Sequence, residues 1–117
     1  MYGAVLVCGG RNYADRATVW RVLDRVADRV EVAAVRHGCA RGADTLAGEW
    51  ARERGIPEQR YPADWQAHGK GAGPRRNQAM LDAADVACVV AFPGGVGTAD
   101  MVRRARAAGL LVWEVKR

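Results

Sequence analysis

A glycine-rich segment with the sequence PGGVGT occupies residues 93–98, between an apolar run and a run with helical spacing. The apolar residues 86–92 predict a buried strand, and residues 99–108 predict a helix. A glycine turn between a strand and a helix presents backbone N–H groups at the positive end of the helix dipole, and this geometry binds phosphate. The segment therefore predicts an anion site made by Gly94, Gly95, Gly97 and Thr98. A tight turn with Thr98 as the helix N-cap would explain the same residues without a ligand.

A second glycine turn, Gly9 and Gly10 followed by Arg11, comes directly after the apolar residues 3–8. Glycines there let the backbone approach a bound molecule closely, and the planar guanidinium of Arg11 suits a phosphate or the face of a base. A plain turn with a solvated arginine is the alternative interpretation.

A third loop contains Gly38, Arg41 and Gly42 and leads into Asp44. Asp44 is expected to accept a hydrogen bond from a ribose hydroxyl. Its place in the first turn of a helix would also stabilise the helix dipole by about 0.3–1 kcal/mol without any ligand. Arg41 is expected to act either as a phosphate partner or as the counter-charge of Asp44.

Further polar and aromatic candidates lie in the second half of the chain. Arg76 and Asn77 open a predicted helix, so both are expected to point into the same crevice as the glycine turns. Trp65 lies in a long predicted loop, where its ring either stacks on a base or covers the core. Asp64 beside it is a candidate acid–base group, although isolated loop carboxylates are usually solvated.

These loops need a scaffold that brings them together, and the apolar pattern predicts alternating strands and helices. Strands are predicted at residues 3–8, 32–36, 58–61, 86–92 and 110–115. Helices are predicted from about residue 15 or 18 to 30, from 43 to the stop at Gly55, from 74 to about 83 and from 99 to 108. Residues 62–74 are predicted to be an irregular loop.

Apolar strands that alternate with helices indicate a parallel sheet covered on both faces. The sequence therefore predicts a single three-layer, Rossmann-like α/β domain over residues 1–117, with about five parallel strands in the order 3-2-1-4-5. Ligands of such sheets bind beyond the carboxyl ends of the strands, at the switch point between strands 1 and 4. All the glycine turns fall at that rim, which predicts one shared site.

Composition limits the class of the protein and its partners. The 117 residues are half hydrophobic and carry a net charge of +5, which suits one globular domain and supports nucleic-acid binding only weakly. The three cysteines have no CxxC or Cys–His spacing, so we expect no metal site and no required cofactor, with Mg²⁺ entering only alongside a bound phosphate. Apolar runs shorter than the ~20 residues of a membrane span, and an N-terminus without a signal-peptide pattern, predict a cytoplasmic protein with no membrane partner.

Four motifs in this order resemble the SLOG superfamily, and within it the small YspA-like or DUF2493 group. They are Gly9-Gly10-Arg11, His37-Gly38-x-Ala40-x-Gly42-Ala43-Asp44, Arg76-Asn77-x-x-Met80 and Pro93-Gly94-Gly95-x-Gly97-Thr98. The resemblance covers nearly the whole chain and implies a Rossmann-like domain that binds a nucleotide or nucleotide-derived ligand, as a sensor or processing module. Members of the superfamily include the LOG phosphoribohydrolases, which release a base from a nucleoside monophosphate, and a domain of the DNA-processing protein DprA.

The resemblance to LOG enzymes also raises the question of catalysis. LOG enzymes continue the PGGxGT motif with a catalytic Glu, and this position is Met101 here. Asp100 lies one residue earlier, and one residue turns a helical side chain by ~100°. Cleavage of an N-glycosidic bond needs a carboxylate near the anomeric carbon, for which the candidates are Asp44, Asp64 and Asp100.

Three functions remain open on the sequence. They are a nucleotide-binding module, a nucleotide N-glycosidase, and a protein that binds single-stranded nucleic acid. An NAD dehydrogenase is disfavoured because the first glycine turn lacks the GxGxxG pattern. A homodimer or higher homo-oligomer is also expected, with Trp20 and Trp113 covering apolar surface.

Overall fold

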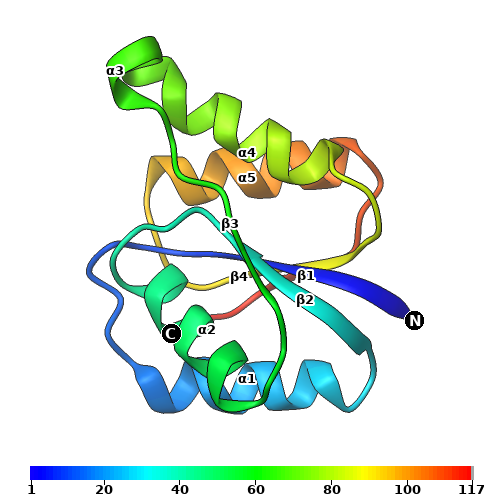
Figure 1. The fold of residues 1–117 in the computed structure, drawn as a ribbon. Coiled ribbons are helices and arrows are strands. Elements are labelled where there is room, and N and C mark those ends of the chain that lie inside the picture. Colours follow the sequence, from blue (N-terminus) through cyan, green and yellow to red (C-terminus); the bar gives the residue numbers. More distant parts are fainter. Residues whose placement is uncertain (117) are drawn as a thin grey trace.

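The computed structural model describes residues 1–116 as one five-stranded parallel sheet with helices on both faces (Figure 1). The strands are β1 (Tyr2–Cys8), β2 (Glu31–His37), β3 (Glu58–Arg60), β4 (Val86–Ala91) and β5 (Val112–Glu114). Their order in the sheet is β3-β2-β1-β4-β5, and every neighbouring pair is parallel. The predicted fold class and strand order are therefore confirmed.

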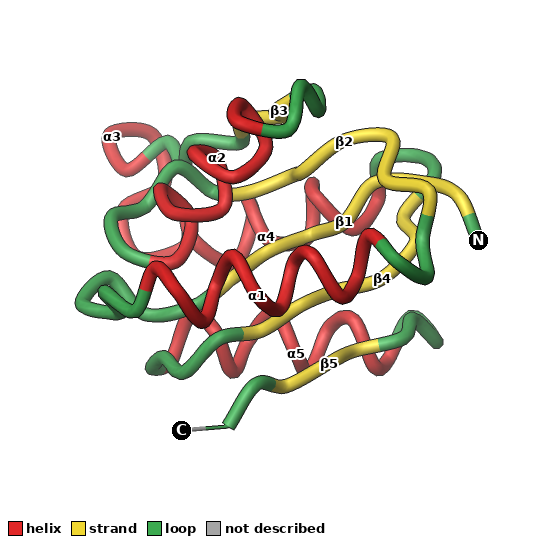
Figure 2. Tube along the Cα trace, turned by 90° about the horizontal axis from the view of Figure 1, so that it is seen from below, coloured by secondary structure: helices red, strands yellow, loops and turns green. Residues whose placement is uncertain are grey.

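The helices are α1 (Arg16–Ala27), α2 (Ala43–Glu53), α3 (Trp65–His68), α4 (Ala72–Asp82) and α5 (Val96–Ala107), with a 3₁₀ turn η1 (Gly69–Gly71) before α4. Helices α1 and α2 pack together on one face of the sheet, and α4 and α5 pack together on the other (Figures 1 and 2). In the described part of the chain, no helix is both long enough and apolar enough to cross a membrane.

The sheet separates two hydrophobic cores because alternate residues of each strand point to opposite faces. On β1, Val5 and Val7 pack into the core under α1 and α2, whereas Leu6 and Cys8 pack into the core under α4 and α5. Burial on both faces explains why the strands are continuously apolar. It also holds the carboxyl ends of β1, β2 and β4 at one fixed edge.

The loop predicted at residues 62–74 is largely helical, so this prediction is wrong. The Asp64 carboxylate accepts a hydrogen bond from the Ala67 N–H at 3.0 Å and caps α3, and the 3₁₀ turn connects α3 to α4. Pro74 is the third residue of α4 rather than its first. A proline fits there because the first four N–H groups of a helix have no partner within the helix.

The glycine segment after β4 is shorter than predicted, because α5 already begins at Val96. The N-cap of α5 is Gly95, which makes no side-chain capping bond, and Thr98 lies within the first turn. The alternative interpretation of Thr98 as the N-cap is therefore wrong.

Candidate functional site

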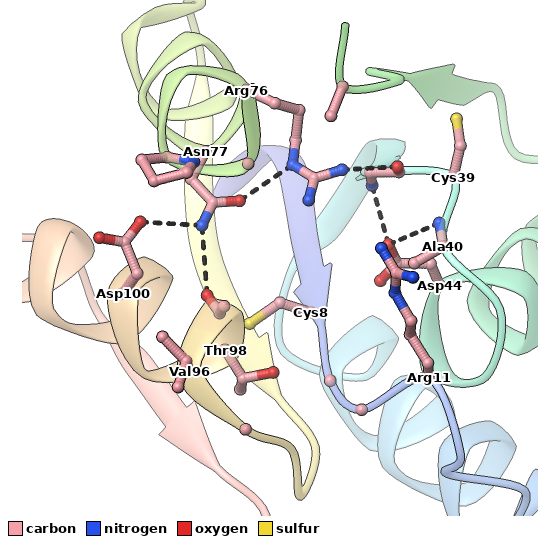
Figure 3. Close-up of a pocket in the computed structure, with 18 of the residues that line it drawn as sticks. Cys8, Arg11, Cys39, Ala40, Asp44, Arg76, Asn77, Val96, Thr98 and Asp100 are labelled. Carbon is pink, nitrogen blue, oxygen red and sulfur yellow. Dashed lines mark hydrogen bonds between the residues drawn. The ribbon is translucent and has the colours of Figure 1, made fainter. Parts of the chain in front are cut away.

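A cavity of about 870 Å³ opens at the carboxyl edge of the sheet, where the loops after β1, β2 and β4 meet α3 and α4 (Figure 3). This is the edge at which parallel α/β sheets bind ligands. Among the predicted site residues, those that line the cavity are Gly9, Gly10, Arg11, Gly38, Arg41, Asp44, Trp65, Arg76, Asn77, Gly95, Gly97, Thr98 and Asp100. The predicted residues outside this lining are Gly42, Asp64 and Gly94.

The helices that begin at this cavity share an unusual N-terminus. The N-caps of α2, α4 and α5 are Gly42, Gly71 and Gly95, and none makes a side-chain capping bond. By contrast, α1 and α3 are capped by the carboxylates of Asp15 and Asp64. At α4 the Ala72 N–H donates to the Gly69 carbonyl of the 3₁₀ turn, and at α2 the Ala43 N–H donates to the Gly10 carbonyl at 3.4 Å. The N-terminus of α5 is therefore the best placed to attract an anion with free N–H groups and a partial positive charge.

The glycines of the PGGVGT segment differ in what surrounds them. A Cβ on Gly94 would overlap the Thr98 hydroxyl and the Gly10 nitrogen, so this glycine permits close packing of two loops. A Cβ on Gly95 or Gly97 would meet no protein atom within 4 Å. These two glycines therefore leave open space at the N-terminus of α5, in the wall of the cavity.

The glycines of the other two loops mainly allow the loops to pack against each other. A Cβ on Gly9 would overlap the Ala43 side chain, and one on Gly42 would overlap the carbonyl oxygen of Gly10. Gly42 also has a φ of +78°, which favours glycine. The Gly10 N–H donates to the Pro93 carbonyl at 2.9 Å, so it is already used within the protein.

A chain of hydrogen bonds joins the loop after β2 to α4 and α5 (Figure 3). Arg76 donates from Nη1 to the Gly38 carbonyl at 2.6 Å and from Nε to the Asn77 Oδ1 at 3.0 Å. Asn77 in turn donates from Nδ2 to the Asp100 Oδ2 at 3.0 Å and to the Gly97 carbonyl at 3.2 Å. Arg76 and Asn77 thus connect the third loop to the first turn of α5.

Asp100 is a buried carboxylate with several donors. Besides Asn77, it accepts hydrogen bonds from Arg103 Nη2 at 2.6 Å and Arg104 Nε at 2.9 Å. Burial raises the pKa of Asp100, but the hydrogen bonds from Asn77 and Arg104 and the charges of Arg104 and Arg103 outweigh it, so the pKa lies below its ordinary value. Met101, at the LOG glutamate position, is buried in the core under α4 and α5 and does not line the cavity.

Asp44 is a buried carboxylate in a different environment. Its Oδ2 accepts hydrogen bonds from the Gly38 N–H at 3.1 Å and the Ala40 N–H at 3.2 Å, whereas its Oδ1 is buried without a partner. Burial raises the pKa of Asp44, even though those two hydrogen bonds and the nearby His37 and Arg76 oppose it. Within residues 1–116, no ion pair joins Asp44 to Arg41, so the counter-charge role predicted for Arg41 has no contact behind it.

His37, at the end of β2, contacts the loop that follows this strand. Its Nδ1 accepts a hydrogen bond from the Cys39 N–H at 3.0 Å, so the ring proton resides on Nε2, which contacts Glu58 Oε2 at 2.5 Å. Arg52 also donates to Glu58, at 2.5 Å. Burial raises the pKa of Glu58, but His37 and Arg52 outweigh it and hold that pKa below its ordinary value. Both ring nitrogens of His37 are therefore engaged in structural contacts.

The lining of the cavity favours an anion with a flat group. Its cationic side chains are Arg11, Arg41, Lys70, Arg76 and Arg103, against the two carboxylates of Asp44 and Asp100. The Arg11 guanidinium lies 5.9 Å from the centre of the Trp65 ring, and Trp65 is 49% exposed. An arginine packed against a half-exposed tryptophan forms a surface on which a base can stack.

Sequence reasoning missed Lys70 and Arg103 as residues of this cavity. Arg103 could have been found, because it lies three residues after Asp100 on a predicted helix, where the two side chains share a face. Lys70 could not, because the segment around it was expected to be irregular. Asp64, a predicted catalytic candidate, serves as a helix cap outside the cavity.

In the described residues, no group of three or more His, Cys, Asp or Glu side chains converges in a way that could hold a metal ion. The thiol of Cys8 lines the cavity, and burial raises its pKa to about 12. A thiol with such a pKa stays protonated and is a poor nucleophile or metal ligand.

Comparison with known proteins agrees with this architecture. Residues 4–68 match the family described as "YspA, cpYpsA-related SLOG family". The gene 61 protein of Mycobacterium phage D29 is 42% identical over 119 residues, a match that covers 92% of this chain and 92% of that protein. The X-ray structure of TM1055, a Northeast Structural Genomics Consortium target, is similar in fold, with a TM-score of 0.73 at 21% identity over 94% of this chain and 72% of that chain.

Proposed function

Because the chain belongs to the YspA, cpYpsA-related SLOG family, we propose that it binds a nucleotide or nucleotide-derived ligand in the cavity at the carboxyl edge of its sheet. Family membership supports a nucleotide-related role at the level of the family. The observation that carries the proposal for this chain is the N-terminus of α5, which has no side-chain cap and two glycines that leave open space.

In the proposed complex, a phosphate of the ligand lies against the backbone N–H groups of Val96, Gly97 and Thr98. These groups belong to the first turn of α5, where no carbonyl of the helix is available to them. The base extends toward the Arg11 and Trp65 surface at the mouth. The cavity of about 870 Å³ falls within the range typical of small-molecule sites.

The test is Gly97→Ala, studied by calorimetric titration with adenosine, guanosine, cytidine and uridine 5′-monophosphates. The new methyl group meets no protein atom within 4 Å, and alanine favours helix over glycine by up to about 1 kcal/mol. We expect unchanged or higher Tm together with an affinity that falls about tenfold or more, equivalent to ~1.4 kcal/mol. A Gly97→Ala protein that binds as well as the wild type would contradict the proposal.

Gly71→Ala is the matched control. Gly71 is the N-cap of α4, has a helical backbone and lies outside the cavity lining. We expect Gly71→Ala to keep the affinity of the wild type.

Repeating the titrations with Mg²⁺ and with EDTA tests the further proposal that magnesium enters only with the phosphates of the ligand. A short single-stranded DNA is included, because nucleic-acid binding would weaken steeply with salt.

Cleavage of the N-glycosidic bond is the second candidate function, and one observation favours it. The carboxylate of Asp100 lines the cavity and has a lowered pKa, so it is ionised at neutral pH. An ionised carboxylate can stabilise positive charge on a sugar ring while the C–N bond breaks and water adds to the anomeric carbon, and the proton that the water loses passes to the departing base. Chromatography of the titrated mixtures detects free base. If no free base forms, cleavage is excluded and nucleotide binding remains the proposed function.

A further inference from the structure

The strongest unexplained feature of the cavity is the free oxygen of Asp44. Asp44 lies in the first turn of α2, and its side chain lines the cavity and is 5% exposed. Its Oδ2 is occupied by two backbone N–H groups, but its Oδ1 has no hydrogen-bond partner (Figure 3). Buried carboxylate oxygens without donors are costly and therefore uncommon.

In residues 1–116, no cationic side chain forms a hydrogen bond or ion pair with Asp44 Oδ1. Arg76 donates to Gly38 and Asn77, and the Arg11 guanidinium packs against the Trp65 ring. The missing donor is therefore one that the protein does not supply. An ionised aspartate oxygen accepts only, so the partner of the Asp44 carboxylate in the cavity must donate an O–H or N–H group.

The position of Asp44 relative to the proposed phosphate site narrows the partner further. Asp44 follows β2 and the PGGVGT segment follows β4, and both strands pair with β1. Two strand spacings separate β2 from β4, which is about 10 Å. A ribose linked to a 5′-phosphate is suited to such a gap, with its hydroxyl groups on the side away from the phosphate.

We propose that Asp44 Oδ1 accepts a hydrogen bond from the 2′- or 3′-hydroxyl of the ligand's ribose, so that the site selects ribonucleotides over analogues that lack this hydroxyl. This inference rests on the proposed function and adds to it the class of sugar. Two contacts fix the loop whose N–H groups bind Asp44 Oδ2. Arg76 donates to the Gly38 carbonyl, and the Cys39 N–H donates to His37. The position of Oδ1 is therefore fixed before a ligand binds. A fixed acceptor loses little freedom on binding.

The first experiment uses the wild-type protein and needs no mutation. The tightest of the four ribonucleoside 5′-monophosphates is compared by calorimetric titration with its 2′-deoxy, 3′-deoxy, 2′-fluoro and 3′-fluoro forms. Fluorine cannot donate a hydrogen bond, so at one of the two positions both the deoxy and the fluoro forms should bind about tenfold or more weakly. Equal affinity for all five compounds would overturn the inference and leave the proposed function intact.

The second experiment repeats the series with Asp44→Asn. The asparagine oxygen can keep the bonds from Gly38 and Ala40, so its NH₂ group replaces Oδ1 and converts an acceptor into a donor. We expect the preference for hydroxyl over fluorine to shrink to about threefold or less. Asp28→Asn, an exposed substitution with the same change of charge, should keep the wild-type preference.

The two proposals fail in different ways. An Asp44→Asn protein that keeps the full wild-type preference would overturn the role of Asp44. If the variant does not fold, as judged by circular dichroism, the wild-type series alone decides. If no nucleotide binds and Gly97→Ala changes nothing, the proposed function fails and the inference fails with it.

Discussion

At the scale of single residues, the cavity holds two buried carboxylates whose pKa values move in opposite directions. Burial dominates at Asp44 and raises its pKa above the ordinary value, although the Ala40 and Gly38 N–H groups and the nearby His37 and Arg76 oppose the shift. At Asp100, burial is outweighed by donors from Asn77, Arg104 and Arg103, so the folded state favours the ionised form. The pKa of the same residue type therefore shifts in opposite directions, because the neighbouring groups differ.

The lowered pKa of Asp100 predicts how stability depends on pH. A group whose folded-state pKa is depressed stabilises the fold above its unfolded pKa, and this contribution is lost as pH falls through the folded pKa. We expect Asp100→Asn to lower the free energy of unfolding at pH 7 by about 1.5–3 kcal/mol, and to make its decrease on acidification below pH ~4 shallower. Urea unfolding between neutral and acidic pH measures both.

Asp28→Asn is the control for this experiment, since Asp28 is exposed. It should follow the wild-type pH profile. Parallel profiles for wild type and Asp100→Asn would mean that the arginines beside Asp100 do not stabilise its charge.

At the scale of elements, α4 has two different ends. Its first turn lines the cavity and continues from the 3₁₀ turn, whose Gly69 carbonyl accepts the Ala72 N–H. Its C-terminus is held by the buried Arg36 of β2, which donates to the carbonyls of Met80 at 2.7 Å, Ala83 at 3.3 Å and Ala84 at 3.0 Å. The Met80 carbonyl belongs to the last turn of α4, at the negative end of the helix dipole, and Ala83 and Ala84 directly follow the helix. Together the three carbonyls offset the buried charge of Arg36. The C-terminal end of α4, away from the cavity, is thus satisfied by a side chain from β2.

Arg36→Met tests this structural role. The methionine keeps much of the apolar volume but leaves three carbonyl groups near the core without their donors. We expect the free energy of unfolding to fall by about 3 kcal/mol or more, because each lost buried bond costs about 1–3 kcal/mol. Chemical unfolding measures the change, with the exposed Arg29→Met as control. Similar stability of the two variants would contradict the assigned role.

At the scale of the whole molecule, the expected homodimer or higher oligomer remains a prediction. Strand β5 lies at one edge of the sheet, with Leu111 63% exposed just before it and Trp113 40% exposed within it. Trp20 is half-buried, and Arg16 and Arg54 pack over its ring at 4.3 and 5.1 Å. Of the two tryptophans expected to cover apolar surface, Trp113 is therefore the better placed for contact with a second copy.

Light scattering after gel filtration measures the oligomeric state. We expect a mass of at least twice the 12.6 kDa of the chain, because exposed apolar groups on an edge strand favour pairing. Leu111→Lys should shift the mass toward the monomer without lowering Tm. The control is Arg25→Lys, a substitution at an exposed position on α1, which should keep the oligomeric state of the wild type. A wild-type protein that elutes as a monomer at tens of micromolar would contradict the prediction.

The predicted scaffold was largely correct because its signals are local. Continuous apolar runs such as residues 86–92 require burial on both faces of a sheet, and right-handed crossovers then leave few strand orders. The glycine turns had to meet at one rim, as they do around the cavity. The segment after β3 was mispredicted because its glycines suggested a loop, whereas the cap by Asp64 stabilises a helical turn there.

The sequence by itself determined the class of fold, the order of the strands and the edge at which a ligand could bind, because these depend on local periodicity and on chain connectivity. Only the tertiary structure decided which polar groups are satisfied. Asp44, Asp64 and Asp100 are alike as sequence letters, yet one has a free buried oxygen, one caps a helix and one is held by arginines. Burial and hydrogen bonding depend on residues distant in the chain, and so the roles of these carboxylates emerge only when the loops pack together.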